Sequence, residues 1–173
     1  MMRRPAAILG SMAFLVLAPG FVVGLVPRWI SHWRFEAPLW GLAVFRWIGA
    51  GLIGAGAAVL LDSFARFALQ GLGTPAPVFP TKHLVVSGLY RHVRNPMYVA
   101  VVSAILGQGL LFGNWRVLEY GAIVWLLAHL FVMGYEEPIL RGTFGGEYKE
   151  FCAQVPRWIP RLTAWKGGAT PAP

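Results

Sequence analysis

Residues 97–135 read MYVAVVSAILGQGLLFGNWRVLEYGAIVWLLAHLFVMGY, and this stretch decides the fold class. It holds two apolar runs, 97–112 and 118–135, which are separated only by residues 113–117. A helix needs about 20 apolar residues to span a bilayer, so each run must recruit a few flanking residues. The pattern predicts a tight helical hairpin within a membrane.

Two further apolar runs precede this hairpin, at residues 6–26 and 39–61. The first could be a signal peptide, but it is longer than the 7–15 residues typical of a signal peptide's apolar region, which favours a membrane span. Arg46 interrupts the second run, and its side chain can extend toward the outer membrane surface. The sequence therefore predicts an all-α membrane protein with about four transmembrane helices.

The composition supports this class. Of the 173 residues, 57% are hydrophobic and 13% are charged, whereas a soluble domain carries about 25% charged residues. The net charge of +8 would suggest nucleic-acid binding in a soluble protein, but in this chain it favours contact with anionic lipids. A single cysteine, Cys152, excludes an intrachain disulfide and a cysteine-cluster metal site, and we expect no metal.

The basic residues predict the orientation, because they gather in cytoplasmic segments. With a cytoplasmic amino terminus, the cytoplasmic side holds Arg3, Arg4, Arg66, Lys82, Arg91, Arg94, Arg141, Lys149, Arg157, Arg161 and Lys166, and the outer side holds Arg28, Arg34 and Arg116. Both termini should then be cytoplasmic. The excess of arginine over lysine is typical of a GC-rich bacterial genome, so we expect the bacterial inner membrane.

Polar groups converge just before Pro96, which should begin the third span. Arg91 and Arg94 lie here, at a helix amino end that favours an anion. They could bind a ligand's carboxylate or phosphate, or they could contact lipid phosphates.

Two adjacent carboxylates, Glu136 and Glu137, follow the fourth span. Acidic groups are unfavourable at a helix carboxyl end, so if the helix stops here the pair needs a cationic ligand, a pairing with Arg91 or Arg94, or full solvation. If the helix continues through Pro138, we expect a kink. His129, within the same span, is interpreted as a hydrogen-bonded packing residue.

After Gly142, apolar residues recur at helical spacing. They predict a short amphipathic helix on the membrane surface, with tryptophan anchors at the inner rim. The apolar positions are Phe144, Tyr148, Phe151 and Val155, and the anchors are Trp158 and Trp165.

Three blocks in order carry a family resemblance: GLYRHVRNPMY at 88–98, YEEPIL at 135–140, and FGGEY at 144–148 with VPRWIP at 155–160. They resemble the signatures of isoprenylcysteine carboxyl methyltransferases and of phospholipid methyltransferases. The resemblance covers about residues 80–161 of one domain at 1–165, with residues 166–173 as a flexible tail.

The resemblance implies S-adenosylmethionine as the cofactor, in a cytoplasmic pocket formed by loops and the carboxyl-terminal helix. Position by position, it implies a cofactor-binding set of His83, Leu84, Tyr90, Arg94, Asn95, Tyr98, Glu136 and Glu137, with Arg94 and Glu137 as catalytic residues. Three positions depart from the family pattern. Asn95 stands where many members have His, Ala100 replaces a common Gly, and Gln154 stands where prenylcysteine enzymes often have a basic residue.

The predicted function is methyl transfer to a lipophilic, membrane-embedded or small acceptor. The acceptor atom could belong to a carboxylate, a thiol or an amine, and a carboxylate or thiolate needs no general base. Two alternatives stay open: an NAD(P)H-dependent membrane reductase of related fold, and a membrane subunit without enzymatic activity.

The topology is tested by single cysteines in a chain whose native thiol is removed by Cys152→Ser. In intact cells, Asn114→Cys should react with a membrane-impermeant thiol reagent and Gly168→Cys should be protected, because the basic loops predict a cytoplasmic carboxyl terminus. Labelling measured by mass shift reports both sites. The reverse pattern would contradict the orientation and place the motif blocks away from the cytoplasm.

Overall fold

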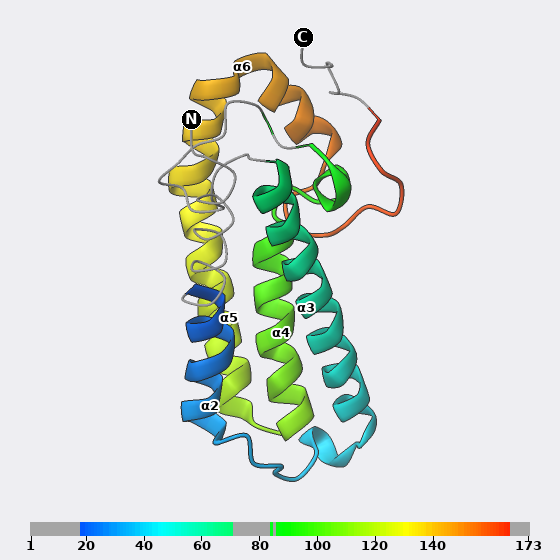
Figure 1. Ribbon diagram of the computed structural model, residues 1–173. Helices are drawn as coiled ribbons and strands as arrows, with labels where there is room; N and C mark the ends of the chain where they lie inside the picture. The colour runs from blue at the N-terminus through cyan, green and yellow to red at the C-terminus, as the bar shows by residue number, and fades with distance from the viewer. Residues whose placement is uncertain (1–17, 71–83, 85, 167–173) are drawn as a thin grey trace.

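The computed structural model describes residues 18–70, 84 and 86–166, with side chains described only as far as Ala65 in the first range. Long antiparallel helices stand side by side, and a shorter helical arm lies across one end of them (Figure 1). The elements are η1 (Gly20–Leu25), α2 (Val26–Ser31), η2 (Leu39–Gly41), α3 (Val44–Gln70), η3 (Gly88–Arg91), α4 (Pro96–Phe112), α5 (Trp115–Phe131), η4 (Val132–Glu136) and α6 (Glu137–Gln154).

Helices α3 and α4 form the most extensive contact of the bundle. Their backbones approach closely because small residues face each other: Gly49 meets Gly107, and Gly56 meets Ala100 and Ala104. A Cβ on Gly49 would lie 2.5 Å from the carbonyl oxygen of Gly107. Such close approach is how membrane helices gain packing contacts without a hydrophobic driving force.

The first described helix, η1 with α2, continues through Pro27, which has no N–H to donate. The helix widens to an i→i+5 pattern just before this proline, and two carbonyls are bonded from neighbouring helices instead. The Gln108 amide donates to Val23 at 2.7 Å, and the Tyr120 hydroxyl donates to Val22 at 3.0 Å. Neighbouring helices thus satisfy backbone groups that have no water to bind inside a membrane.

The connections at the lower end of Figure 1 are tied together by hydrogen bonds. The backbone N–H of Glu36 donates to the carbonyl of Phe112 in α4 at 2.8 Å, and the Glu36 carboxylate accepts from the Asn114 amide at 2.6 Å. Arg46 reaches this loop and donates to the Glu36 carbonyl at 2.6 Å. Gly113 ends α4 in the left-handed region, with φ of 74°, and Asn114 caps α5. The predicted tight helical hairpin is confirmed as the pair α4 and α5.

Two helix boundaries differ from the ends of the apolar runs. The second run begins at Leu39, but α3 begins only at Val44, because Trp40 and Gly41 adopt positive φ after Pro38. Pro96 begins α4, as predicted. The helix of the fourth run continues beyond Tyr135: α5 passes through the widened turn η4 and Pro138 into α6, and the kink lies at Gly145.

Two of the described helices are long and apolar enough to cross a membrane, Val44–Ala65 and the continuous Trp115–Gln154. The apolar helices Gly20–Ser31 and Pro96–Phe112 are shorter. Residues 6–17 of the predicted first span, the proline-rich segment 74–80 and the tail at 167–173 lie outside the described residues.

The close contact between α3 and α4 predicts a position-specific effect of added methyl groups. Gly49→Ala should destabilise the protein by about 1–3 kcal/mol, because its Cβ would meet backbone atoms that cannot move aside independently. Gly51→Ala is the matched control, since its Cβ meets nothing within 4 Å, and it should be neutral or stabilising. Thermal unfolding in detergent checks both variants, and equal melting temperatures would contradict the packing described here.

Candidate functional site

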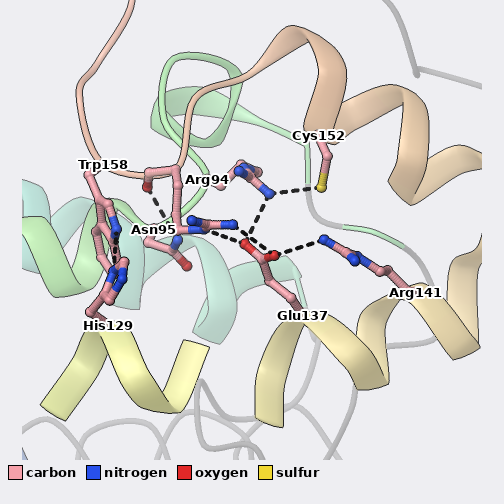
Figure 2. Close-up of polar contacts among 8 residues, drawn as sticks. Arg94, Asn95, His129, Glu137, Arg141, Cys152 and Trp158 are labelled. Atoms are coloured by element: carbon pink, nitrogen blue, oxygen red, sulfur yellow. Dashed lines mark hydrogen bonds and ion pairs between the residues drawn. The ribbon is translucent and has the colours of Figure 1, made fainter. Parts of the chain in front are cut away.

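Glu137 lies at the centre of a cluster of three arginines at the end of the bundle where α6 begins (Figure 2). Its carboxylate is 3.1 Å from Arg94, 3.1 Å from Arg141 and 2.6 Å from Arg157. Arg157 binds both carboxylate oxygens, which is the strong bidentate geometry. The Glu137 residue is only 4% exposed, so this carboxylate is held by charge rather than by water.

The arginines of this cluster come from segments that are distant in the sequence. Arg94 precedes α4, Arg141 lies one turn along α6, and Arg157 belongs to the segment that follows α6. Arg94 also donates to the sulfur of Cys152 at 2.8 Å (Figure 2). The cluster therefore joins three of the sequence blocks around one carboxylate.

The segment 155–165 is bound along residues 91–95 by backbone hydrogen bonds. Arg94 donates to Pro156, Arg161 to His92, and Trp165 to Arg91. Side chains add to this pairing, because the Asn95 amide donates to the Arg157 carbonyl at 3.2 Å and Arg91 donates to the Trp165 carbonyl at 2.6 Å. Of the two predicted partners for the acidic pair, Arg94 is confirmed, whereas Arg91 binds the carboxyl-terminal segment.

A small apolar core supports this arrangement. Tyr148, Phe151, Val155 and Trp165 are buried together, with Leu84 packed against them. The predicted amphipathic helix exists as the second half of α6, but its apolar face is covered by the chain itself and does not lie open to a membrane. The predicted role of Trp165 as a membrane anchor is likewise wrong, because it is 8% exposed within this core.

Glu136 has a different environment from its neighbour. It is half-buried and accepts a hydrogen bond from the Tyr98 hydroxyl at 3.3 Å. Tyr90 lies close enough that burial, and secondly the charge of Glu136, raise the pKa of its phenol well above the ordinary value. Within the described part of the chain, no arginine or lysine forms an ion pair with Glu136.

One polar atom beside these carboxylates is buried and has no hydrogen-bond partner among the described residues, Nε of Arg94. A buried donor without a partner costs about 1–3 kcal/mol, so such an atom is a candidate contact for a ligand. S-adenosylmethionine carries a carboxylate, an ammonium and a sulfonium. The Arg94 Nε–H fits the carboxylate, and Glu136 with its tyrosines fits the cations, so the residues present are suited to this cofactor.

His129 is hydrogen-bonded, as the sequence indicated. The indole N–H of Trp158 donates to Nδ1 of His129 at 3.0 Å (Figure 2), and the Trp125 ring stacks on the imidazole. Trp158 therefore binds α5 and is not only a surface anchor.

The structure brings most of the predicted site residues to one end of the bundle. Arg94, Asn95 and Glu137 share one network, and Tyr90, Tyr98 and Glu136 form a second group beside it. Leu84 belongs to the apolar core, and His83 lies outside the described residues. Arg157 and Arg141 were not predicted as partners of Glu137, although Arg157 lies in the VPRWIP block.

Comparisons with known proteins extend these observations. Residues 44–147, more than half of the chain, match the family model described as phospholipid methyltransferase. A region of 87 residues is 32% identical to the cobalt-zinc-cadmium resistance protein CzcN of Cupriavidus metallidurans, covering 50% of this chain and 40% of that protein. A region of 80 residues is 33% identical to the protein-S-isoprenylcysteine O-methyltransferase of Schizosaccharomyces pombe, covering 46% of this chain and 34% of that protein.

The matched regions thus span well under half the length of both curated relatives. Among the described residues, no group of three or more His, Cys, Asp or Glu side chains is arranged to hold a metal ion. The matched family region includes α3, α4 and α5, the Arg94 segment and both carboxylates. By this match the chain belongs to the phospholipid methyltransferase family.

Proposed function

We propose that this protein is an integral membrane enzyme that transfers a methyl group from S-adenosylmethionine to a lipophilic acceptor. The observation that carries the proposal is the unequal environment of two adjacent carboxylates. Three guanidinium groups surround Glu137, whereas Glu136 has a tyrosine hydroxyl as its partner among the described residues. A half-buried carboxylate of this kind is a suitable site for a ligand's positive charge.

The bound cofactor would supply a methyl group already activated on a sulfonium, so the protein's task is positioning and electrostatics. Glu136 would attract the ammonium and sulfonium, with the electron-rich faces of Tyr90 and Tyr98 beside them. Arg94 would bind the cofactor's carboxylate through Nε–H. The backbone at His83 and Leu84 would meet the adenosine.

Glu137 and Asn95 act through other residues in this proposal. Glu137 holds the guanidinium of Arg94 at 3.1 Å, so we assign to it the positioning of Arg94 rather than contact with a cation. Asn95 binds the carbonyl of Arg157 and thereby closes the carboxyl-terminal segment over the site. Transfer would depend on both Arg94 and Glu137, as the sequence predicts, but through different contacts.

The acceptor proposal is supported by the family description and by the apolar exterior of the helices. One family name indicates phospholipids and one relative's name indicates an isoprenylcysteine carboxyl group, and both describe lipophilic molecules. Such an acceptor would enter from the bilayer, and the cofactor would enter from the cytoplasm. We place the protein in the bacterial inner membrane with both termini cytoplasmic.

Binding measurements with the purified protein test the proposed function. The wild type should bind S-adenosylhomocysteine in calorimetry, and NADPH, which the reductase alternative requires, should not bind. Glu136→Gln should lower the S-adenosylmethionine affinity about 10- to 150-fold, because a charge-assisted contact contributes about 1.5–3 kcal/mol. Glu119→Gln, the same chemical change at an exposed position near the start of α5, is the control and should leave this affinity unchanged. Binding of NADPH alone, or equal affinity in Glu136→Gln, would contradict the proposal.

Arg94→Lys tests the contact with the cofactor's carboxylate. Lysine keeps the charge but has no Nε–H beside its terminal donors, so the apparent KM for S-adenosylmethionine should rise about tenfold or more. The KM for the acceptor should change little. If Arg94 contacted only lipid phosphates, a point charge would suffice and the lysine variant would have the wild-type cofactor KM. Steady-state rates at varied cofactor concentration distinguish the two results.

A further inference from the structure

A line of aromatic side chains leads from Glu136 toward the exposed apolar surface of α5. The Tyr98 hydroxyl binds Glu136, and the Tyr98 ring lies edge-on to Trp158 at 6.5 Å between centroids. Trp158 contacts His129, and Trp125 stacks on His129 at 5.3 Å with an interplanar angle of 20°. Trp125 is 42% exposed. The line therefore joins the proposed cofactor group to a surface where a bilayer would lie.

The hydrogen bond from Trp158 determines which form of His129 is present. An indole N–H can only donate, so Nδ1 of His129 must hold a lone pair at 3.0 Å from it. The ring is then neutral with its proton on Nε2. Among the described residues, this Nε2–H has no hydrogen-bond partner. His129 thus offers one N–H donor in an otherwise apolar, aromatic setting.

The position of His129 suits an acceptor rather than the cofactor. It lies seven residues before Glu136 in the continuous helix, which is about 10 Å along the axis. Its neighbours along α5 are exposed and apolar, with Leu130 at 58% and Leu126 at 49%. A molecule held at His129 would have its apolar part against these leucines and tryptophans and its polar end toward Glu136.

We propose that His129, held by Trp158, is the residue that recognises the methyl acceptor, and that its Nε2–H selects an anionic nucleophile on an apolar chain. This inference rests on the proposed function. The acceptor's lone pair forms the new bond to the methyl carbon, and the carbon–sulfur bond breaks with its electron pair remaining on sulfur. Because a carboxylate or thiolate carries no proton on the attacking atom, no base is needed. A protonated amine has no lone pair, so its N–H groups would face the Nε2–H of His129 and no hydrogen bond would form.

The test uses the purified protein, labelled S-adenosylmethionine and three acceptor probes. The probes share an unbranched alkyl chain and differ in the polar group at its end. Dodecanoate presents a carboxylate, 1-dodecanethiol a thiol that releases its proton to water before it attacks as the thiolate, and dodecylamine a protonated amine. We expect methylation of the carboxylate or the thiol probe and none of the amine. His129→Phe keeps the stacking but loses both ring nitrogens, so the acceptor KM should rise about tenfold while the affinity for S-adenosylhomocysteine stays at the wild-type value.

Two further variants separate recognition from mere packing. His129→Gln can still accept from Trp158 and donate to the acceptor, so it should restore the acceptor KM to within about threefold of wild type. Leu127→Ala, which is about as exposed as Leu130 but lies two residues before His129 and so on another side of α5, controls for a general change of the helix surface and should retain the wild-type acceptor KM. An unchanged acceptor KM in His129→Phe overturns the inference, and so does a glutamine variant as impaired as the phenylalanine variant.

The probes also distinguish this inference from the function on which it rests. If the wild type binds S-adenosylhomocysteine but methylates only dodecylamine, or none of the probes, the acceptor inference is wrong and the proposed function stands. If the wild type does not bind S-adenosylhomocysteine, the proposed function fails and the inference fails with it.

Discussion

One buried carboxylate organises the end of the bundle that carries the site. Glu137 is almost inaccessible to water, and an unpaired charge in such a place would be strongly unfavourable. Arg94 and Arg157, whose side chains are 11% and 26% exposed, therefore have to remain in place, whereas Arg141 is 63% exposed and contributes little. Removing one partner of a buried pair typically costs about 3–5 kcal/mol. The positions of the Arg94 segment and of the carboxyl-terminal segment depend on this constraint.

The same constraint explains why two neighbouring glutamates serve different ends. Because Glu137 takes up three guanidinium groups, none of them pairs with Glu136 among the described residues. Glu136 is left with a tyrosine hydroxyl, and its negative charge remains available to a ligand. Arg94 leaves a donor rather than an acceptor without a partner. Its Nη1 donates to Glu137, while its Nε is buried without a partner among the described residues. In the proposed function, complementary sites for an anion and a cation thus lie beside one another.

Two helices continue through a proline, and the backbone groups nearby still find hydrogen-bond partners. Pro27 and Pro138 each follow a turn that has widened to an i→i+5 pattern. At Pro27, Gln108 and Tyr120 bind the nearby carbonyls from other helices, which fastens the first described helix to α4 and α5. A wide turn of this kind keeps a helix continuous through proline, and such turns are frequent at functional sites. At Pro138 the widened turn places Glu136 at its last position, beside Tyr98.

The sequence by itself determined the helical class, the hairpin at 113–114 and the beginning of α4 at Pro96, because apolar run length, glycine and proline act locally. It also named Arg94, together with Arg91, among the alternative partners of the acidic pair, and it identified the blocks that meet at the site. It could not show that α5 continues past Pro138 or that the face of Tyr148 and Phe151 is covered by Trp165. Those outcomes depend on contacts between segments far apart in the chain. Only the tertiary structure decided which carboxylate receives the arginines, because adjacent helix residues point in different directions and the choice between them is made by packing.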